Sequence, residues 1–193
     1  ANVNGRKLMG KKMVKFLPGI PSLEEEVRAK LVQRDLQPGA DVVVMVLNAG
    51  EIDVLANFVC SMAKYHISMA NVMVFAASED IVPIIESMGA MGIYHNDSFA
   101  HAPRNASGEY LDRTFIDMMW YKSFSVWLLL KMKYNVLFQD IDLVWFRSPF
   151  TYFRKTHDDY SYTKSSFTDS LMSYMLPGQA KAAQAAAEQQ ELR

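Results

Sequence analysis

Residues 42–47 restrict the possible folds of this chain more than any other segment, because they form a continuous run of β-branched and apolar residues. A run without polar alternation is typical of a parallel strand covered on both faces. Helical patterns at 52–65 and 81–88 alternate with further strand patterns at 72–76 and 91–94. This rhythm predicts an α/β domain with a Rossmann-like, mostly parallel sheet, flanked by helices and built with right-handed crossovers.

A fourth strand pattern, residues 136–138, ends in Gln139 and leads into Asp140 and Asp142. If the strand continues, its alternation places both carboxylates on one face, a short distance apart. Two like charges beside apolar neighbours are costly without a positive partner, and Mg²⁺ or Mn²⁺ is suited to one or two carboxylates plus substrate phosphates. The pair therefore predicts a metal site for a diphosphate. The alternative is that both are solvated acids at a strand end, which the apolar residues on either side disfavour.

Ligands of open parallel sheets bind beyond the carboxyl ends of the strands. This rule places residues 48–51, residues 77–80 and the pair Asp140/Asp142 along one rim, where a nucleotide could bridge them. Residues 112–133 form the longest predicted helix, which is apolar nearly all round except at Lys122. Two interpretations of Lys122 stay open. It pairs with an anion, or its stem lies on the apolar face while the ammonium reaches water.

The chain has 193 residues, of which 50% are hydrophobic, enough for a sizeable core. We expect a lead-in with a short helix at 1–40, a nucleotide-sugar-binding domain at 41–176 and an Ala/Gln-rich terminal helix at 177–193. Ser22 and Glu25 match a capping box for the first helix. The single cysteine, Cys60, lies in an apolar run and is expected in the core.

The formal net charge of −1 argues against a nucleic-acid partner. No apolar run reaches the length of a bilayer span, and no targeting segment is recognisable. Asn96-Asp97-Ser98 and Asn105-Ala106-Ser107 match the N-glycosylation pattern, which slightly favours a secretory compartment.

Four features of the sequence together indicate a family resemblance. They are the strand ending in Asn48, the helix with Asn57 and Ser61, Lys122 in a long apolar helix, and the segment VLFQDIDLVWFRSPF. In these features, residues 41–150 resemble the nucleotide-diphospho-sugar transferase family of eukaryotic glycosyltransferases. The resemblance implies a GT-A fold with an Asp-x-Asp motif. It also implies a Mn²⁺- or Mg²⁺-dependent transfer of a sugar from a nucleotide-diphosphate donor to a glycan or glycoprotein acceptor, in the Golgi lumen or another secretory compartment.

By the same resemblance, Asp142 is the direct metal ligand, and Asp140 binds the donor ribose and the metal. Asn48, with Ala49 and Gly50, holds the nucleoside, while Lys122 approaches the diphosphate or the sugar. Gln139 belongs to the same donor-binding segment. No residue is identified as a catalytic base or nucleophile.

The sequence departs from the family pattern after Pro149, where much of the C-terminal acceptor half gives way to an alanine-rich tail. His157 and Asp158 are the only nearby candidates for a further metal ligand. The membrane anchor typical of the family is not recognisable either, so we expect membrane contact only through an anchor that this chain lacks.

Two alternatives stay open at this point. A haloacid-dehalogenase-like phosphohydrolase also ends an apolar strand in Asp-x-Asp, with Asp140 as nucleophile and Asp142 as acid/base. The other alternative is a non-catalytic donor-binding remnant of a transferase.

Overall fold

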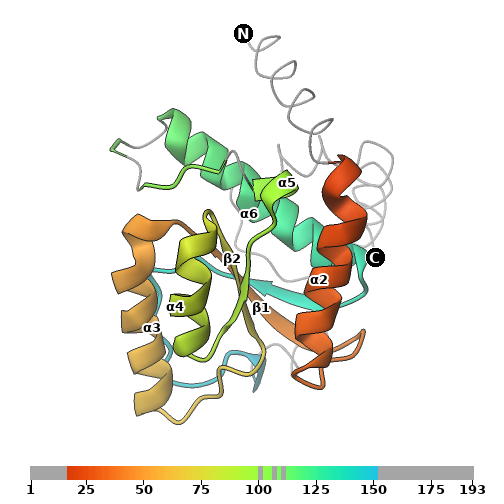
Figure 1. The fold of residues 1–193 in the computed structure, drawn as a ribbon. Helices are drawn as coiled ribbons and strands as arrows, with labels where there is room; N and C mark the ends of the chain where they lie inside the picture. The colour runs from red at the N-terminus through yellow and green to blue at the C-terminus, as the bar shows by residue number, and fades with distance from the viewer. Residues whose placement is uncertain (1–16, 100–101, 106–107, 110–111, 152–193) are drawn as a thin grey trace, which may run out of the picture. The chain divides into compact units, whose positions relative to one another are not determined.

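The computed structural model describes residues 17–99, 102–105, 108–109 and 112–151 (Figure 1). The chain divides into two compact units, Ala1–Ser148 and Pro149–Arg193, and the fold described below is that of the first unit. The predicted lead-in up to residue 16, the terminal helix at 177–193, and His157 and Asp158 lie outside the described residues.

A four-stranded parallel sheet forms the centre of the first unit, with strand order β3-β2-β1-β4. The strands are β1 (Asp41–Leu47), β2 (Val72–Ala76), β3 (Met91–Ile93) and β4 (Asn135–Phe138). Every residue of β2 and all but the first residue of β1 are buried. These two strands are the inner ones, and their burial shows that both of their faces are covered. The predicted α/β fold with a parallel sheet is confirmed.

The helices pack on the two faces of this sheet (Figure 1). One face carries α3 (Ile52–Lys64) and α4 (Val82–Ser87), as right-handed crossovers in one direction require. The long helix α6 (Arg113–Lys131) contacts β1 and β4, and α2 (Ile20–Val32) contacts β3. An ion pair between Lys131 and Glu24 links α6 to α2. The remaining helices are single turns: η1 (Leu17–Gly19), η2 (Ala49–Glu51), η3 (Glu79–Ile81) and α5 (Asn96–Phe99).

The predicted capping box of the first helix is wrong. Helix α2 begins at Ile20, before Ser22, with Pro21 in its first turn, where the missing N–H of proline costs no hydrogen bond. Ser22 instead donates its hydroxyl to the carbonyl oxygen of Gly19, at 3.0 Å. It also contacts His95 Nε2 at 3.0 Å, which ties α2 to the segment after β3.

The expectation that Cys60 belongs to the core is also wrong, because Cys60 is exposed. The buried side of α3 is formed by Leu55, Phe58 and Met62. Cys60 lies two residues from Phe58, so at 100° per residue it points away from that side. Among the described residues, no helix combines the length and the apolar character needed to cross a membrane.

Gly92 in β3 allows the strand to approach α4 closely, which gives a first testable prediction. A Cβ atom on Gly92 would lie 3.1 Å from Val82 Cγ1 and 3.2 Å from the Val82 carbonyl oxygen. The Val82 carbonyl belongs to the backbone and cannot rotate away from the new Cβ atom as a flexible side chain would. We therefore expect Gly92→Ala to lower the free energy of unfolding by about 1–3 kcal/mol in urea titrations followed by circular dichroism.

Gly108→Ala is the matched control, because a Cβ atom there would meet nothing within 4 Å. Its stability should stay within about 0.5 kcal/mol of the unmodified chain. Equal stabilities of the two variants would contradict the close packing of β3 on α4.

Candidate functional site

The carboxyl ends of β2, β1 and β4 bring three polar segments to one edge of the sheet. Strand β1 lies between the other two, and residues 48–51, 77–80 and 139–142 follow the three strands directly. The Ala77 N–H donates to the Leu47 carbonyl at 2.9 Å, and the Gln139 N–H donates to the Val44 carbonyl at 3.1 Å. The structure therefore places the three predicted segments along a common rim.

Asn48 organises the turn after β1. Its Oδ1 accepts from the Gly50 N–H at 3.0 Å, while its own N–H donates to Glu51 Oε2 at 2.9 Å, which completes a capping box. The Asn48 Nδ2 donates to the Asn105 carbonyl at 2.9 Å. Asn48 is buried, and its amide is engaged within the protein, whereas Ala49 and Gly50 are exposed. Of these three predicted nucleoside contacts, Ala49 and Gly50 are the ones that present atoms to a ligand at the rim.

Lys122 reaches from α6 to this edge and forms an ion pair with Asp140 Oδ1. Its side chain is only 16% exposed, whereas that of Asp140 is 57% exposed. A lysine so well covered needs a nearby anion to offset its desolvation. Of the two interpretations of Lys122, the structure supports pairing with an anion, and that anion is the Asp140 carboxylate.

Asp140 and Asp142 lie beyond the strand, not within it. Strand β4 ends at Phe138, so the prediction that strand alternation orients the two acids is wrong. Both acids are exposed, and they flank Ile141, which is buried. Burial of Ile141 anchors the turn while its two charged neighbours stay accessible to solvent.

Glu51 is the residue of this edge that the sequence interpretation missed. Burial raises the pKa of the Glu51 carboxyl above its usual value. Its hydrogen bond from the Asn48 N–H and the positive charge of Lys122 lower this pKa, while the negative charges of Asp140 and Asp142 raise it. Glu51 is thus within electrostatic reach of all three charged groups. The signal in the sequence is the capping-box pattern from Asn48 to Glu51, directly after an apolar strand.

Two buried polar atoms at this edge have no hydrogen-bond partner among the described residues. They are Nε2 of Gln139, which follows β4, and Oγ of Ser78, which follows β2. Ser78 is the N-cap of η3 by position, yet its side chain makes no capping hydrogen bond. Unpaired buried polar groups are uncommon in folded proteins, and both lie where open α/β sheets bind ligands.

In the part of the chain that the structure describes, no group of three or more His, Cys, Asp or Glu side chains is arranged to enclose a metal ion. If Asp140 and Asp142 bound a cation, they would offer it carboxylate oxygens without a complete protein cage. This donor set suits Mg²⁺ or Mn²⁺, which commonly take one or two carboxylates and complete their coordination with water and substrate phosphates.

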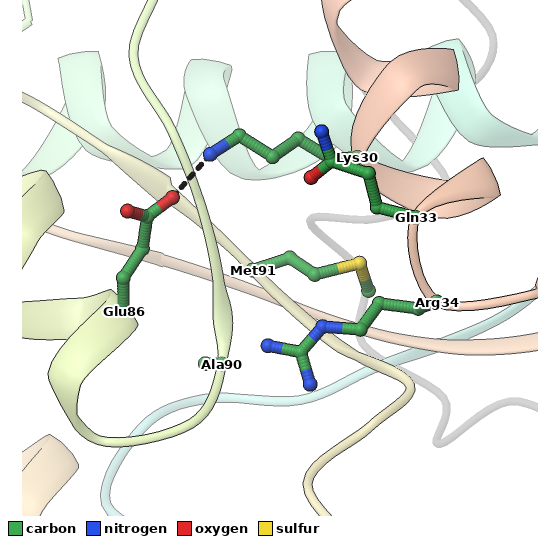
Figure 2. A pocket seen from close by; sticks show the side chains of 6 residues that line it. All are labelled: Lys30, Gln33, Arg34, Glu86, Ala90 and Met91. Carbon is green, nitrogen blue, oxygen red and sulfur yellow. Dashed lines mark hydrogen bonds and ion pairs between the residues drawn. The ribbon is translucent and has the colours of Figure 1, made fainter.

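A separate cavity of about 260 Å³ lies at the opposite, amino edge of the sheet, where β3 begins (Figure 2). Figure 2 shows Lys30 of α2 reaching Glu86 of α4, while Arg34, from the turn after α2, points toward Ala90. Lys30 forms an ion pair with Glu86, and Arg34 Nη2 donates to the Gly89 carbonyl at 3.2 Å. Both basic groups are therefore engaged in joining the C-terminal ends of α2 and α4, away from the acids that follow β4.

Comparison with known proteins identifies one family. The nucleotide-diphospho-sugar transferases match residues 68–175, which is more than half of the chain and includes Lys122, Asp140 and Asp142. No curated protein and no solved structure matches the chain. The parallel sheet flanked by helices agrees with the Rossmann-like GT-A fold predicted from the resemblance. From this match, the chain belongs to the nucleotide-diphospho-sugar transferase family.

Proposed function

We propose that this chain is a metal-dependent glycosyltransferase that moves a sugar from a nucleotide-diphosphate donor to a glycan or glycoprotein acceptor. The observation that carries this proposal is the cluster of Lys122, Asp140, Asp142 and Glu51 at the carboxyl edge of a parallel sheet. Such an edge binds nucleotides in open α/β proteins, and family membership supports a nucleotide-sugar donor.

The chemistry of sugar transfer fits these side chains. Breaking the bond between the sugar and the phosphate leaves negative charge on the departing diphosphate, and cationic groups stabilise that charge where it develops. Asp140 and Asp142 would hold a Mn²⁺ or Mg²⁺ ion, which supplies positive charge to the diphosphate when it is bound. Lys122 supplies a second positive group from α6, and the exposed Ala49 and Gly50 offer their backbone to the nucleoside.

The family match favours this proposal over the phosphohydrolase alternative. The phosphohydrolase motif would make Asp140 the nucleophile, but the family that matches this chain is one of sugar transferases, and the match includes Asp140. A phosphohydrolase would release phosphate from generic phosphomonoesters, and this activity would be lost in Asp140→Asn. We expect no such activity in the unmodified chain.

Calorimetric titration with uridine diphosphate and guanosine diphosphate, each with and without Mn²⁺, tests the donor site directly. We expect at least one of the two to bind, with an affinity about tenfold or more higher when Mn²⁺ is present. Absence of binding under all four conditions would contradict the donor site. Binding without sugar transfer to any glycan or glycoprotein acceptor, or to water, would instead support a non-catalytic donor-binding protein.

A further inference from the structure

Lys122 interacts with two carboxylates that follow different strands. It forms its ion pair with Asp140, which follows β4, and it also interacts electrostatically with Glu51, which follows β1. Asp142 contributes a third negative charge that Glu51 senses. With all four groups ionised, the one ammonium and the three carboxylates carry a net charge of −2.

This charge balance suggests a competition at Asp140. A divalent cation would compensate this charge, but Lys122 already forms an ion pair with Asp140 Oδ1, so a cation bound to the same carboxylate would lie close to the ammonium. Two cations on one carboxylate repel each other even when each contacts a different oxygen. Lys122 therefore weakens metal binding at Asp140 unless its ammonium moves away.

Glu51 offers Lys122 a second anion. The Glu51 carboxylate accepts the Asn48 N–H at 2.9 Å, so its position is fixed by the turn that ends β1. Lysine is suited to such a movement, because its ammonium is a compact charge on a flexible four-carbon stem.

We propose that Lys122 is an internal counter-cation of the metal site. It holds Asp140 in the free protein, and it moves toward Glu51 and the donor diphosphate when a divalent cation binds Asp140 and Asp142. This inference rests on the proposed function and adds an order of events to it. The cation and the diphosphate bind cooperatively, because the diphosphate stabilises the displaced lysine.

The test compares Mn²⁺ binding by the full chain and by its Lys122→Met variant, measured from the electron paramagnetic resonance signal of free Mn²⁺. Without nucleotide, the variant should bind Mn²⁺ about tenfold more tightly, because a competing positive charge is removed. With Mn²⁺ and the nucleoside diphosphates used above, the same variant should bind the diphosphate about tenfold more weakly. A residue that only supports the fold would not move these two affinities in opposite directions.

Lys131→Met is the matched control, since Lys131 lies on the same helix and forms an ion pair with Glu24 instead. It should leave both affinities unchanged. Glu51→Gln keeps an acceptor for the Asn48 N–H but removes the charge, and it should weaken Mn²⁺ binding about threefold. Circular dichroism of each variant verifies that it is folded.

The outcomes separate this inference from the proposed function. If the unmodified chain binds Mn²⁺ and diphosphate, but Lys122→Met binds Mn²⁺ equally or more weakly, the exchange of Lys122 is wrong while the donor site stands. If only the variant binds Mn²⁺ in the absence of nucleotide, the exchange is supported. If neither protein binds Mn²⁺ or diphosphate, both proposals are wrong.

Discussion

Asp142→Asn should lower the Mn²⁺-dependent affinity for a nucleoside diphosphate on the order of 100-fold. Asp142 is exposed beside the buried Ile141, so this substitution removes a charge without removing a packing contact of the core. An amide carries no net charge and binds hard divalent cations more weakly than a carboxylate. The metal-free affinity should stay the same or rise slightly, because one charge that repels the diphosphate is gone. Calorimetric titrations with and without Mn²⁺ measure both values.

Asp53→Asn is the control for charge alone, since Asp53 is an exposed acid in the first turn of α3. It should leave the Mn²⁺-dependent affinity unchanged. Asp140→Asn tests metal binding less directly, because it also removes the ion-pair partner of Lys122. A Mn²⁺-dependent affinity that survives in Asp142→Asn would overturn the assignment of Asp142 as a metal ligand.

The sheet was predictable from the sequence because its inner strands are buried on both faces. Burial of this kind demands continuous apolar runs, and those runs coincide with β1 and β2 to within one residue at each end. Helices α3 and α4 were also found, because each follows a strand and carries its apolar residues with helical spacing, and α6 was found because its long segment is apolar nearly all round. Parallel pairing of the strands then made the carboxyl edge the expected place for a site, whereas the order of the strands came only from the structure.

Details that depend on contacts between distant segments were not predictable. The start of α2 was misplaced because Ser22-x-x-Glu25 has the pattern of a capping box, while the hydroxyl of Ser22 bonds to Gly19 and contacts His95. Cys60 was assigned to the core because its neighbours in sequence are apolar, whereas its place on the helix directs it outward.

The charged cluster shows the same limit. The sequence marked Asp140 and Asp142 by their position after a strand, and it marked Lys122 by its apolar neighbours. It did not indicate that Lys122 and Asp140 pair, because 18 positions separate them and only the packing of α6 along β4 brings them together. Glu51 was overlooked because a capping glutamate is usually explained by the helix that it caps.

Trp145→Ala should have the largest effect on stability of the substitutions considered, with a loss of about 3–5 kcal/mol in the free energy of unfolding. Trp145 is buried, and its ring meets that of Phe58 edge to face, with centroids 5.4 Å apart. Its backbone N–H also donates to Ser61 Oγ at 3.3 Å. These contacts fasten the segment after Asp142 to α3, so the truncation leaves a cavity and loosens the turn that carries both acids.

The measurement is thermal unfolding, for which a loss of this size corresponds to a midpoint lower by roughly 10 °C. Phe146→Ala is a demanding control, because Phe146 is the adjacent aromatic residue but is 69% exposed, and it contacts Tyr65 only at the surface. That variant should lose less than about 1 kcal/mol. Trp145→Phe keeps an aromatic ring beside Phe58 and should recover much of the stability.

If the turn is held as described, Trp145→Ala should also bind diphosphate more weakly at temperatures where it remains folded. Equal stability of the Trp145→Ala and Phe146→Ala variants would show that α3 does not hold this segment in place.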